Sequence, residues 1–77
     1  MITRYDRKTK KESEYKLPDG AEMYVEDLSS IICCASCGKK VVAGDTFTSM
    51  EIMNGMGFGY LVCEKCYEQE YKRRYGE

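Results

Sequence analysis

The sequence has no histidine and no tryptophan, and its 77 residues include one proline and two phenylalanines. Without histidine, a closed metal site made from the protein's own side chains has to be built from cysteine. Serine hydroxyls likewise have no histidine base to activate them, which removes the usual route to a nucleophilic serine. No glycine-rich loop has a phosphate-binding form. The sequence therefore predicts a protein that binds rather than an enzyme.

Long hydrophobic runs are also absent. No stretch approaches the roughly 20 apolar residues that a membrane-spanning helix needs, and residues 1–8 are polar where a secretory signal would have an apolar segment. We therefore expect a cytoplasmic protein, in which thiols stay reduced and closely spaced cysteines hold metal. A disulfide framework is the alternative interpretation.

The chain is short for a domain that must fold on apolar packing alone. A domain of 77 residues with seven tyrosines, five methionines and no tryptophan has a marginal hydrophobic core. A structural metal compensates for a small core, because its binding free energy adds to the free energy of folding. The composition thus indicates a structural role for the cysteines.

Two cysteine pairs organise the sequence. Cys34 and Cys37 form one Cys-x2-Cys pair, and Cys63 and Cys66 form a second pair after 25 intervening residues. Two such pairs supply the four sulfurs of a tetrahedral zinc site, although this separation is somewhat longer than usual. The predicted cofactor is one structural Zn²⁺ held by these four residues. The fifth cysteine, Cys33, is predicted to be a spare thiol rather than a ligand.

The N-terminal half gives weaker local signals. Alternation at residues 2–6 and 13–17 predicts a short β-hairpin, with an extended arm as the alternative. The segment 17–20 has the composition of a type I turn. A strand is predicted at 21–25, and apolar residues at i, i+3 and i+4 predict a helical turn at 28–32.

The C-terminal half is predicted with more detail. Residues 40–43 suit a short strand, and Gly38 suits the positive φ that a cysteine knuckle requires. Strands at 46–53 and 60–62 are joined by a glycine-rich turn at 54–59. Residues 64–75 predict a helix, whose Tyr67, Tyr71 and Tyr75 form one stripe and whose pairs Glu68–Lys72 and Glu70–Arg74 have the favourable order. The expected organisation is a β-rich extension at 1–32 and a four-cysteine module at 33–77.

The order of knuckle, β-hairpin and helix over residues 33–75 resembles the treble-clef class of zinc fingers. Cys34 and Cys37, followed by Gly38, match the first knuckle of that family, and Cys63 and Cys66 match its helix-borne pair. The resemblance implies a small metal-stabilised α+β fold. The competing metal interpretation is a rubredoxin-like iron carrier, but that family uses a glycine after both pairs, and here Tyr67 follows the second.

Protein binding is the predicted function, with an adapter, inhibitor or regulator as the expected type. Met53, Met56 and Phe58 lie on or beside the glycine-rich turn, and methionine and aromatic residues are enriched in interface cores. The alternative is that these side chains fold back over the tyrosine stripe. By analogy, small acidic proteins of this kind occur on phages and mobile elements, where they inhibit host machinery.

Nucleic-acid binding is the second predicted function. Lys72, Arg73 and Arg74 on the helix are candidate partner-binding residues, and together with Lys65, Lys39 and Lys40 they are predicted to form a basic face. The net charge of −1 disfavours this function, because nucleic-acid-binding domains are usually basic. The charge is uneven, however: residues 1–16 carry six basic and three acidic side chains, whereas residues 17–32 carry four acidic side chains and no basic one.

Overall fold

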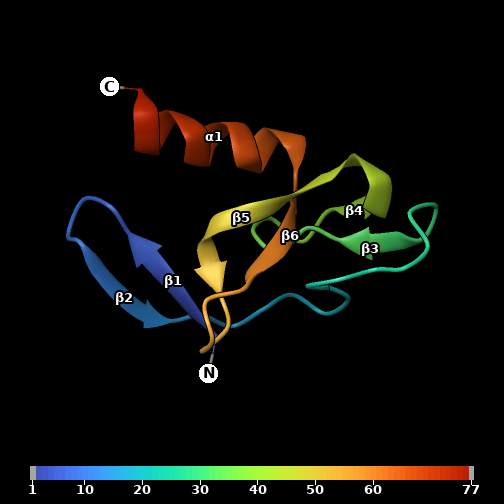
Figure 1. The fold of residues 1–77 in the computed structure, drawn as a ribbon, viewed down its shortest axis with the longest axis horizontal. Coiled ribbons are helices and arrows are strands. Elements are labelled where there is room, and N and C mark those ends of the chain that lie inside the picture. Colours follow the sequence, from blue (N-terminus) through green and yellow to red (C-terminus); the bar gives the residue numbers. More distant parts are fainter. Residues whose placement is uncertain (1, 77) are drawn as a thin grey trace.

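The computed structural model describes residues 2–76, which form a four-stranded antiparallel sheet, a two-stranded sheet and a C-terminal helix (Figure 1). The four-stranded sheet has the order β2-β1-β5-β6, and the smaller sheet pairs β3 with β4. In chain order the elements are β1 (Thr3–Asp6), β2 (Lys11–Glu14), β3 (Ile31–Cys33), β4 (Lys40–Val42), the 3₁₀ turn η1 (Ala43–Asp45), β5 (Thr46–Met53), β6 (Gly59–Cys63) and α1 (Glu64–Tyr75). The chain is thus a small α+β protein.

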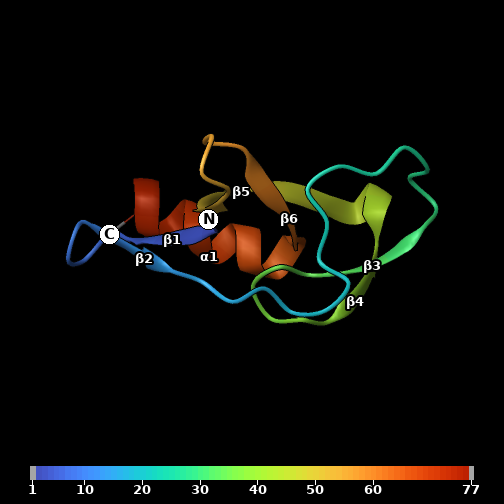
Figure 2. The ribbon, with the colours of Figure 1, turned by 90° about the horizontal axis from the view of Figure 1, so that it is seen from below.

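Helix α1 lies across one side of the four-stranded sheet, and the β3–β4 ribbon lies at the opposite end of the molecule from the β1–β2 hairpin (Figures 1 and 2). The fully buried core is small and consists of Cys34, Ala35, Ile52 and Val62. Two of these residues, Cys34 and Ala35, lie in the segment of the first cysteine pair, so the metal-binding segment and the hydrophobic core are continuous. This arrangement places the cysteines where β6, α1 and the β3–β4 loop meet.

The N-terminal hairpin is confirmed, and the extended arm is not what the chain adopts. β1 pairs with β2 over four positions, and the second strand begins two residues earlier than predicted, at Lys11. β1 also pairs with β5, where Thr3 lies opposite Met53 and Arg4 opposite Ile52. Residues of the predicted extension and of the four-cysteine module therefore share one sheet.

The turn after the hairpin differs from the predicted type I turn by one position. The amide of Ala21 donates to the carbonyl oxygen of Pro18 at 3.3 Å, so the turn begins at Pro18 rather than Leu17. Gly20 then occupies its third position with φ +90°, which a type II turn requires. A Cβ on Gly20 would lie 2.9 Å from Cys33 Sγ, so the close approach of β3 also demands glycine here.

The predictions for residues 21–32 are wrong. The predicted strand at 21–25 is reduced to a single parallel bridge between Ala21 and Cys33. The predicted helical turn at 28–32 is replaced by a reverse turn and the start of β3. The cause is local: Asp27 Oδ1 accepts hydrogen bonds from the amide and hydroxyl of Ser29, at 2.9 and 2.7 Å, and such side-chain bonds compete with helix formation.

The β5–β6 hairpin and the helix at 64–75 are confirmed, but β5 contains an irregularity that the sequence did not indicate. The register between β5 and β6 shifts between Thr48 and Met53. As a result the usual alternation of buried and exposed residues is lost, and Ser49, Glu51 and Ile52 are all buried. Two polar side chains therefore enter the interior beneath α1.

Replacing Gly59 with alanine should destabilise the protein by about 2 kcal/mol. An added Cβ would overlap the carbonyl oxygen of Ser49 and lie 2.7 Å from Thr48 Cγ2, at the irregular part of β5. Gly57 is the matched control, since it has φ +88° but no atom within 4 Å of an added Cβ, and its replacement should cost about 1 kcal/mol. Urea unfolding of both variants measures the difference, and equal losses would contradict the expectation.

Candidate metal centre

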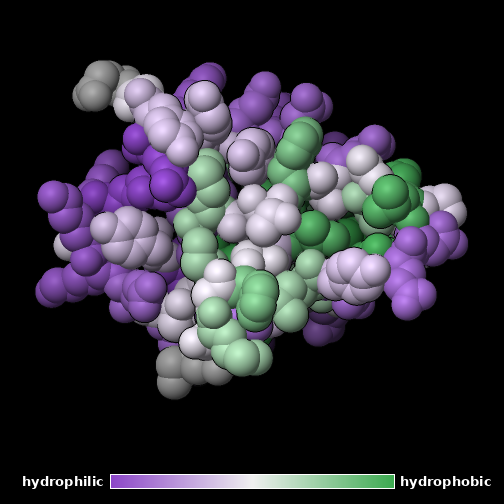
Figure 3. Space-filling model, viewed as in Figure 1, coloured by the Kyte–Doolittle hydropathy of each residue, from purple (hydrophilic) through white to green (hydrophobic). Residues whose placement is uncertain are grey.

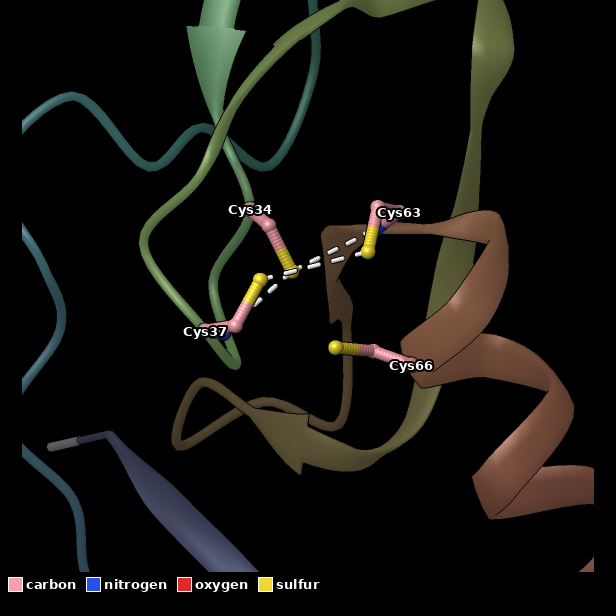
Figure 4. A group of neighbouring side chains, drawn as sticks. All are labelled: Cys34, Cys37, Cys63 and Cys66. Carbon is pink, nitrogen blue, oxygen red and sulfur yellow. Dashed lines mark hydrogen bonds between the residues drawn. The ribbon is translucent and has the colours of Figure 1, made fainter.

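The structure brings four cysteines together at one point (Figure 4). Cys34 and Cys37 come from the loop between β3 and β4, Cys63 ends β6, and Cys66 lies in the first turn of α1. Their Sγ atoms all lie within 4.8 Å of one another. Tetrahedral zinc with Zn–S bonds of about 2.3 Å requires sulfurs about 3.8 Å apart, and the Cys37 and Cys63 Sγ atoms are separated by 4.0 Å. The four sulfurs are placed to hold one metal ion.

The first cysteine pair sits in a tight knuckle. The amide of Gly38 donates to the carbonyl oxygen of Cys34, and the amide of Cys34 donates to Lys39, both at 2.8 Å. Gly38 has φ +79°, as its position after the second cysteine predicted. The tight turn directs the amides of Ser36 and Cys37 at Cys34 Sγ, at 3.3 and 3.4 Å.

The second pair reaches the knuckle through β6. The amide of Ala35 donates to the carbonyl oxygen of Leu61 at 3.0 Å, which holds the knuckle against the strand that leads to Cys63. The amide of Cys63 then donates to Cys34 Sγ at 3.3 Å. The residue that precedes α1 therefore supplies a third amide donor to Cys34 Sγ, beside those of Ser36 and Cys37.

Three of the four thiols differ in pKa before a metal is bound. Burial opposes ionisation of Cys34, but the three amides that donate to its sulfur outweigh burial and lower its pKa to about 7. Burial raises the pKa of Cys66 to about 12, and the neighbouring thiols act in the same direction. Burial also raises the pKa of Cys37. Cys34 therefore provides the first thiolate, and the other two must lose protons when a metal binds.

Metal affinity is expected to rise steeply with pH. Since Cys37 and Cys66 both have a raised pKa, their thiols hold protons at pH 7, and an incoming Zn²⁺ must displace both. Release of these two protons makes the apparent association constant rise at least about 100-fold per pH unit, and below pH 7 the proton of Cys34 makes the dependence steeper. Competition with a chromophoric chelator at pH 6, 7 and 8 measures this dependence. An affinity that stays constant over this interval would contradict it.

Cys33 lies outside the sulfur group. It is the last residue of β3, it is half-buried beside Gly20, and it is directed away from the knuckle because neighbouring residues of a strand alternate in direction. All five cysteines are unpaired, so the disulfide alternative is not what this structure contains.

Two tyrosines lie next to the centre, and the sequence predicted this position for neither of them. The hydroxyl of Tyr15 donates to the carbonyl oxygen of Ala35 at 2.6 Å, which ties the N-terminal segment to the knuckle. Tyr67, next to Cys66 on α1, stacks on Phe47 of β5 with ring centroids 4.9 Å apart. The alternation at residues 13–17 predicted a strand, but nothing in the sequence indicated the backbone partner of Tyr15.

The face of α1 that packs on the sheet includes only Tyr67 of the predicted tyrosine stripe. Tyr71 and Tyr75 are 52% and 60% exposed, whereas Glu70 is 1% exposed. The Glu70 carboxylate accepts the hydroxyl of Ser49 at 2.6 Å and the amide of Met50 at 2.7 Å. Glu70 is thus committed to β5, and among residues 2–76 it does not form the predicted ion pair with Arg74.

A second buried carboxylate, that of Glu51, lies between the helix and the N-terminal hairpin. Arg73 donates to it from Nη2 at 2.8 Å and from Nε at 3.1 Å, and Arg7 donates from Nε at 3.3 Å. Arg73, a predicted partner-binding residue, therefore also joins α1 to β5 and to the hairpin. The sequence carried no signal for this contact, because its three residues are distant along the chain.

The remaining predicted partner-binding residues lie in two places. Met56 and Phe58 are 80% and 59% exposed at the β5–β6 turn, and Met53 is half-buried at the end of β5. Lys72, Arg73 and Arg74 are in the last turn of α1. The other members of the predicted basic face line a different part of the surface, next to the start of α1, where acidic residues accompany them: Lys39, Lys40 and Lys65 with Asp45, Glu64 and Glu68. The predicted single basic face is therefore divided.

Comparisons of the chain with models of protein families, with curated proteins and with solved structures found no match. Within residues 2–76, α1 is too short and too polar to cross a membrane, and no other α-helix is present to do so. What the geometry supports is a small α+β protein whose four clustered cysteines can bind a metal ion.

Proposed function

We propose that the metal is a single structural Zn²⁺ and that the fold is of the treble-clef type. Four thiolates are the ligand set of a closed zinc site, and a closed site leaves no position for a substrate. The succession of a knuckle, the β5–β6 hairpin and α1 with Cys63 and Cys66 at its start supports the treble-clef assignment. A cytoplasmic location would keep the thiols reduced and available to the metal.

The rubredoxin-like alternative has less support. Its second cysteine pair would need a glycine knuckle, whereas Cys66 lies inside a helical turn and Tyr67 continues the helix. Elemental analysis of the purified protein, with a visible absorbance spectrum, tests the metal. One zinc per chain and no colour is the expected result, and one iron per chain with a red colour would favour electron transfer.

The protein is further proposed to act by binding another protein rather than by catalysis. The observation that carries this proposal is the exposure of Met56 and Phe58 at the β5–β6 turn, because large apolar side chains held in solvent mark interaction sites. The turn is ordered by Asn54, whose Oδ1 accepts the amides of Met56 and Phe58 at 2.8 and 3.0 Å. The apolar side chains are therefore presented on a defined loop, which lowers the entropic cost of binding.

The segment 22–24 extends this apolar surface. Asn54 Nδ2 approaches Met23 Sδ at 3.4 Å, and the amide of Leu61 donates to Glu22 at 2.9 Å, so the segment lies beside the turn. Met23 and Tyr24 are exposed, and hydrophobic side chains reach the lower edge of the molecule where the turn lies (Figure 3). Since residues 17–32 carry four acidic and no basic side chains, the partner we propose has an apolar cleft bordered by basic residues.

The double variant Met56→Asp, Phe58→Asp should lose partner binding while it keeps its metal. An anchoring side chain at an interface centre contributes about 2 kcal/mol or more, so binding should weaken at least about 30-fold. Cross-linking followed by affinity capture, with metal content measured in parallel, checks both parts. The control Tyr71→Asp, Tyr75→Asp adds the same charge at exposed aromatic residues of α1. Equal losses in both variants would count against the turn as the binding surface.

A further inference from the structure

The structure separates charge between the two ends of the molecule. The β1–β2 hairpin loop and the last turn of α1 lie at the same end in both views (Figures 1 and 2), and hydrophilic side chains gather there (Figure 3). Eight of the twelve basic residues of the chain belong to the whole β1–β2 hairpin and to the last turn of α1, whereas the hairpin carries three acidic residues, Asp6, Glu12 and Glu14; the basic residues are Arg4, Arg7, Lys8, Lys10, Lys11, Lys72, Arg73 and Arg74. We call this surface the basic end. The net charge of −1 therefore does not describe the local potential.

A pocket of about 360 Å³ lies in the basic end, between β1, its following loop, β5 and α1. Its charged lining consists of Arg4, Arg7, Lys8 and Arg73, against the carboxylates of Asp6 and Glu51. Asp6 Oδ1 accepts the amide of Lys8 at 2.9 Å, so one of its oxygens is committed to the loop. The pocket has more positive than negative side chains, which is the condition for holding an anion.

The buried carboxylate of Glu51 orients the two arginines of this pocket. Glu51 is 3% exposed, and both of its oxygens accept guanidinium hydrogens. Arg7 uses only Nε for this contact, which leaves its two terminal nitrogens for another acceptor. One carboxylate holding two guanidinium groups leaves a positive charge that a second anion can neutralise. The arginines are thus pre-positioned, and little side-chain entropy remains to be lost on binding.

We propose that the basic end binds the sugar–phosphate backbone of a single-stranded nucleic acid and that one phosphate group occupies the pocket between Arg7 and Arg73. Guanidinium groups match phosphate oxygens through paired hydrogen bonds. Further basic residues lie on the two elements that border the pocket, Lys10 and Lys11 in the hairpin and Lys72 and Arg74 on α1, and a ligand with repeated phosphates can contact several of them. Tyr71 and Tyr75, whose ring centroids are 4.6 Å apart, are exposed on the side of α1 away from Arg73, so bases can stack on them where the strand continues past the pocket and around the helix.

Fluorescence anisotropy of labelled single-stranded oligonucleotides of 12 nucleotides, titrated with the zinc-loaded protein, tests this proposal. Each phosphate contact on a single strand contributes a slope of about −0.7 to the dependence of log K on log salt. With four contacts, affinity should fall about 50-fold between 50 and 200 mM salt. Absence of binding at 50 mM salt would overturn the proposal, and so would binding of inorganic phosphate without binding of the oligonucleotide.

The double variant Arg4→Gln, Lys8→Gln removes two cations of the pocket without touching the Glu51 contacts. The salt slope should become shallower by about 1.4, and affinity at 50 mM salt should fall on the order of tenfold. The matched control Lys39→Gln, Lys40→Gln removes two cations near the metal centre and should bind as the parent does. Arg7→Lys keeps the charge but loses the paired donors, so it should weaken binding as well. Equal losses in the first variant and the control would overturn the proposal.

Two further experiments distinguish phosphate recognition at the basic end from general anion binding and from binding at the β5–β6 turn. A poly-glutamate peptide of matched charge should bind less tightly than the oligonucleotide, and equal affinity would overturn phosphate recognition. Met56→Asp with Phe58→Asp should leave oligonucleotide binding unchanged, because the β5–β6 turn lies away from the basic end (Figure 1). Loss of oligonucleotide binding in that variant would overturn the placement of the nucleic acid at the basic end. Loss of protein-partner binding alone would support the proposed function and leave the nucleic-acid proposal intact.

Discussion

Replacing Cys66 with serine is expected to unfold the protein and abolish metal binding. A structural zinc contributes about 10–16 kcal/mol of binding free energy at pH 7, and a domain of this size has only a few kcal/mol of stability from its core. Here the fully buried core consists of Cys34, Ala35, Ile52 and Val62, and its first two residues are positioned by the knuckle. Loss of one ligand therefore removes the metal and loosens half of the core.

Amide chemical-shift dispersion in a ¹H–¹⁵N spectrum, with zinc content measured on the same sample, checks this expectation. The same collapse should follow for serine at Cys34, Cys37 or Cys63. Serine at Cys33 is the control: it should retain one zinc per chain and a dispersed spectrum, because this thiol lies outside the sulfur group. A Cys66→Ser protein that keeps its dispersion without metal would show that the cysteines are not structural.

Glu70→Gln is expected to destabilise the protein by about 2 kcal/mol, and Glu70→Ala by about 3–4 kcal/mol. Ser49 Oγ accepts the amides of Glu51 and Ile52, so its own hydrogen must be donated to Glu70. The amide of Met50 donates to the other carboxylate oxygen. Glutamine offers one acceptor oxygen where two donors arrive, and alanine offers none. In both variants a buried donor loses its partner.

Thermal and urea unfolding of the zinc-loaded variants measures these losses. Glu68→Ala removes an exposed carboxylate from the same helix and should change the unfolding free energy by no more than about 0.5 kcal/mol. If Glu70→Gln were as stable as the parent, Glu70 would not be the acceptor that holds the irregular part of β5 in place.

Helix α1 illustrates which features could be predicted from the sequence and which could not. The helix, its limits and its favourable C-terminal charges follow from local composition, and these were predicted correctly. The tyrosine stripe indicated the buried face only in part, because Tyr67 packs against the core whereas Tyr71 and Tyr75 are exposed. Cys66 must face the other three sulfurs, and residues four and seven positions later then face the sheet. In a helix as polar as α1, the position of a metal ligand therefore indicates the buried face better than hydrophobicity does. Counting from Cys66, this criterion places Glu70 and Arg73 on the buried face.

The failure of the predicted strand at residues 21–25 has a different origin. The segment makes single contacts with distant parts of the chain, such as Glu22 with Leu61 and Ala21 with Cys33. Local patterns do not carry information about such contacts. By contrast, the four cysteines and Gly38 were predicted because metal geometry and backbone stereochemistry leave few alternatives at these positions.

The narrow junction between β1 and β5 has a consequence for how the molecule opens. Among residues 2–76, only Thr3 and Arg4 of the N-terminal hairpin pair with β5, and every residue of β2 is exposed. The N-terminal hairpin is therefore a cooperative unit that can detach while the metal-linked half stays folded, and its amide hydrogens should exchange with solvent faster than those of β6. The contact of Glu51 with Arg7 and Arg73 joins this hairpin to β5 and α1. An anion bound between the two arginines would strengthen this connection and slow hydrogen exchange throughout the hairpin.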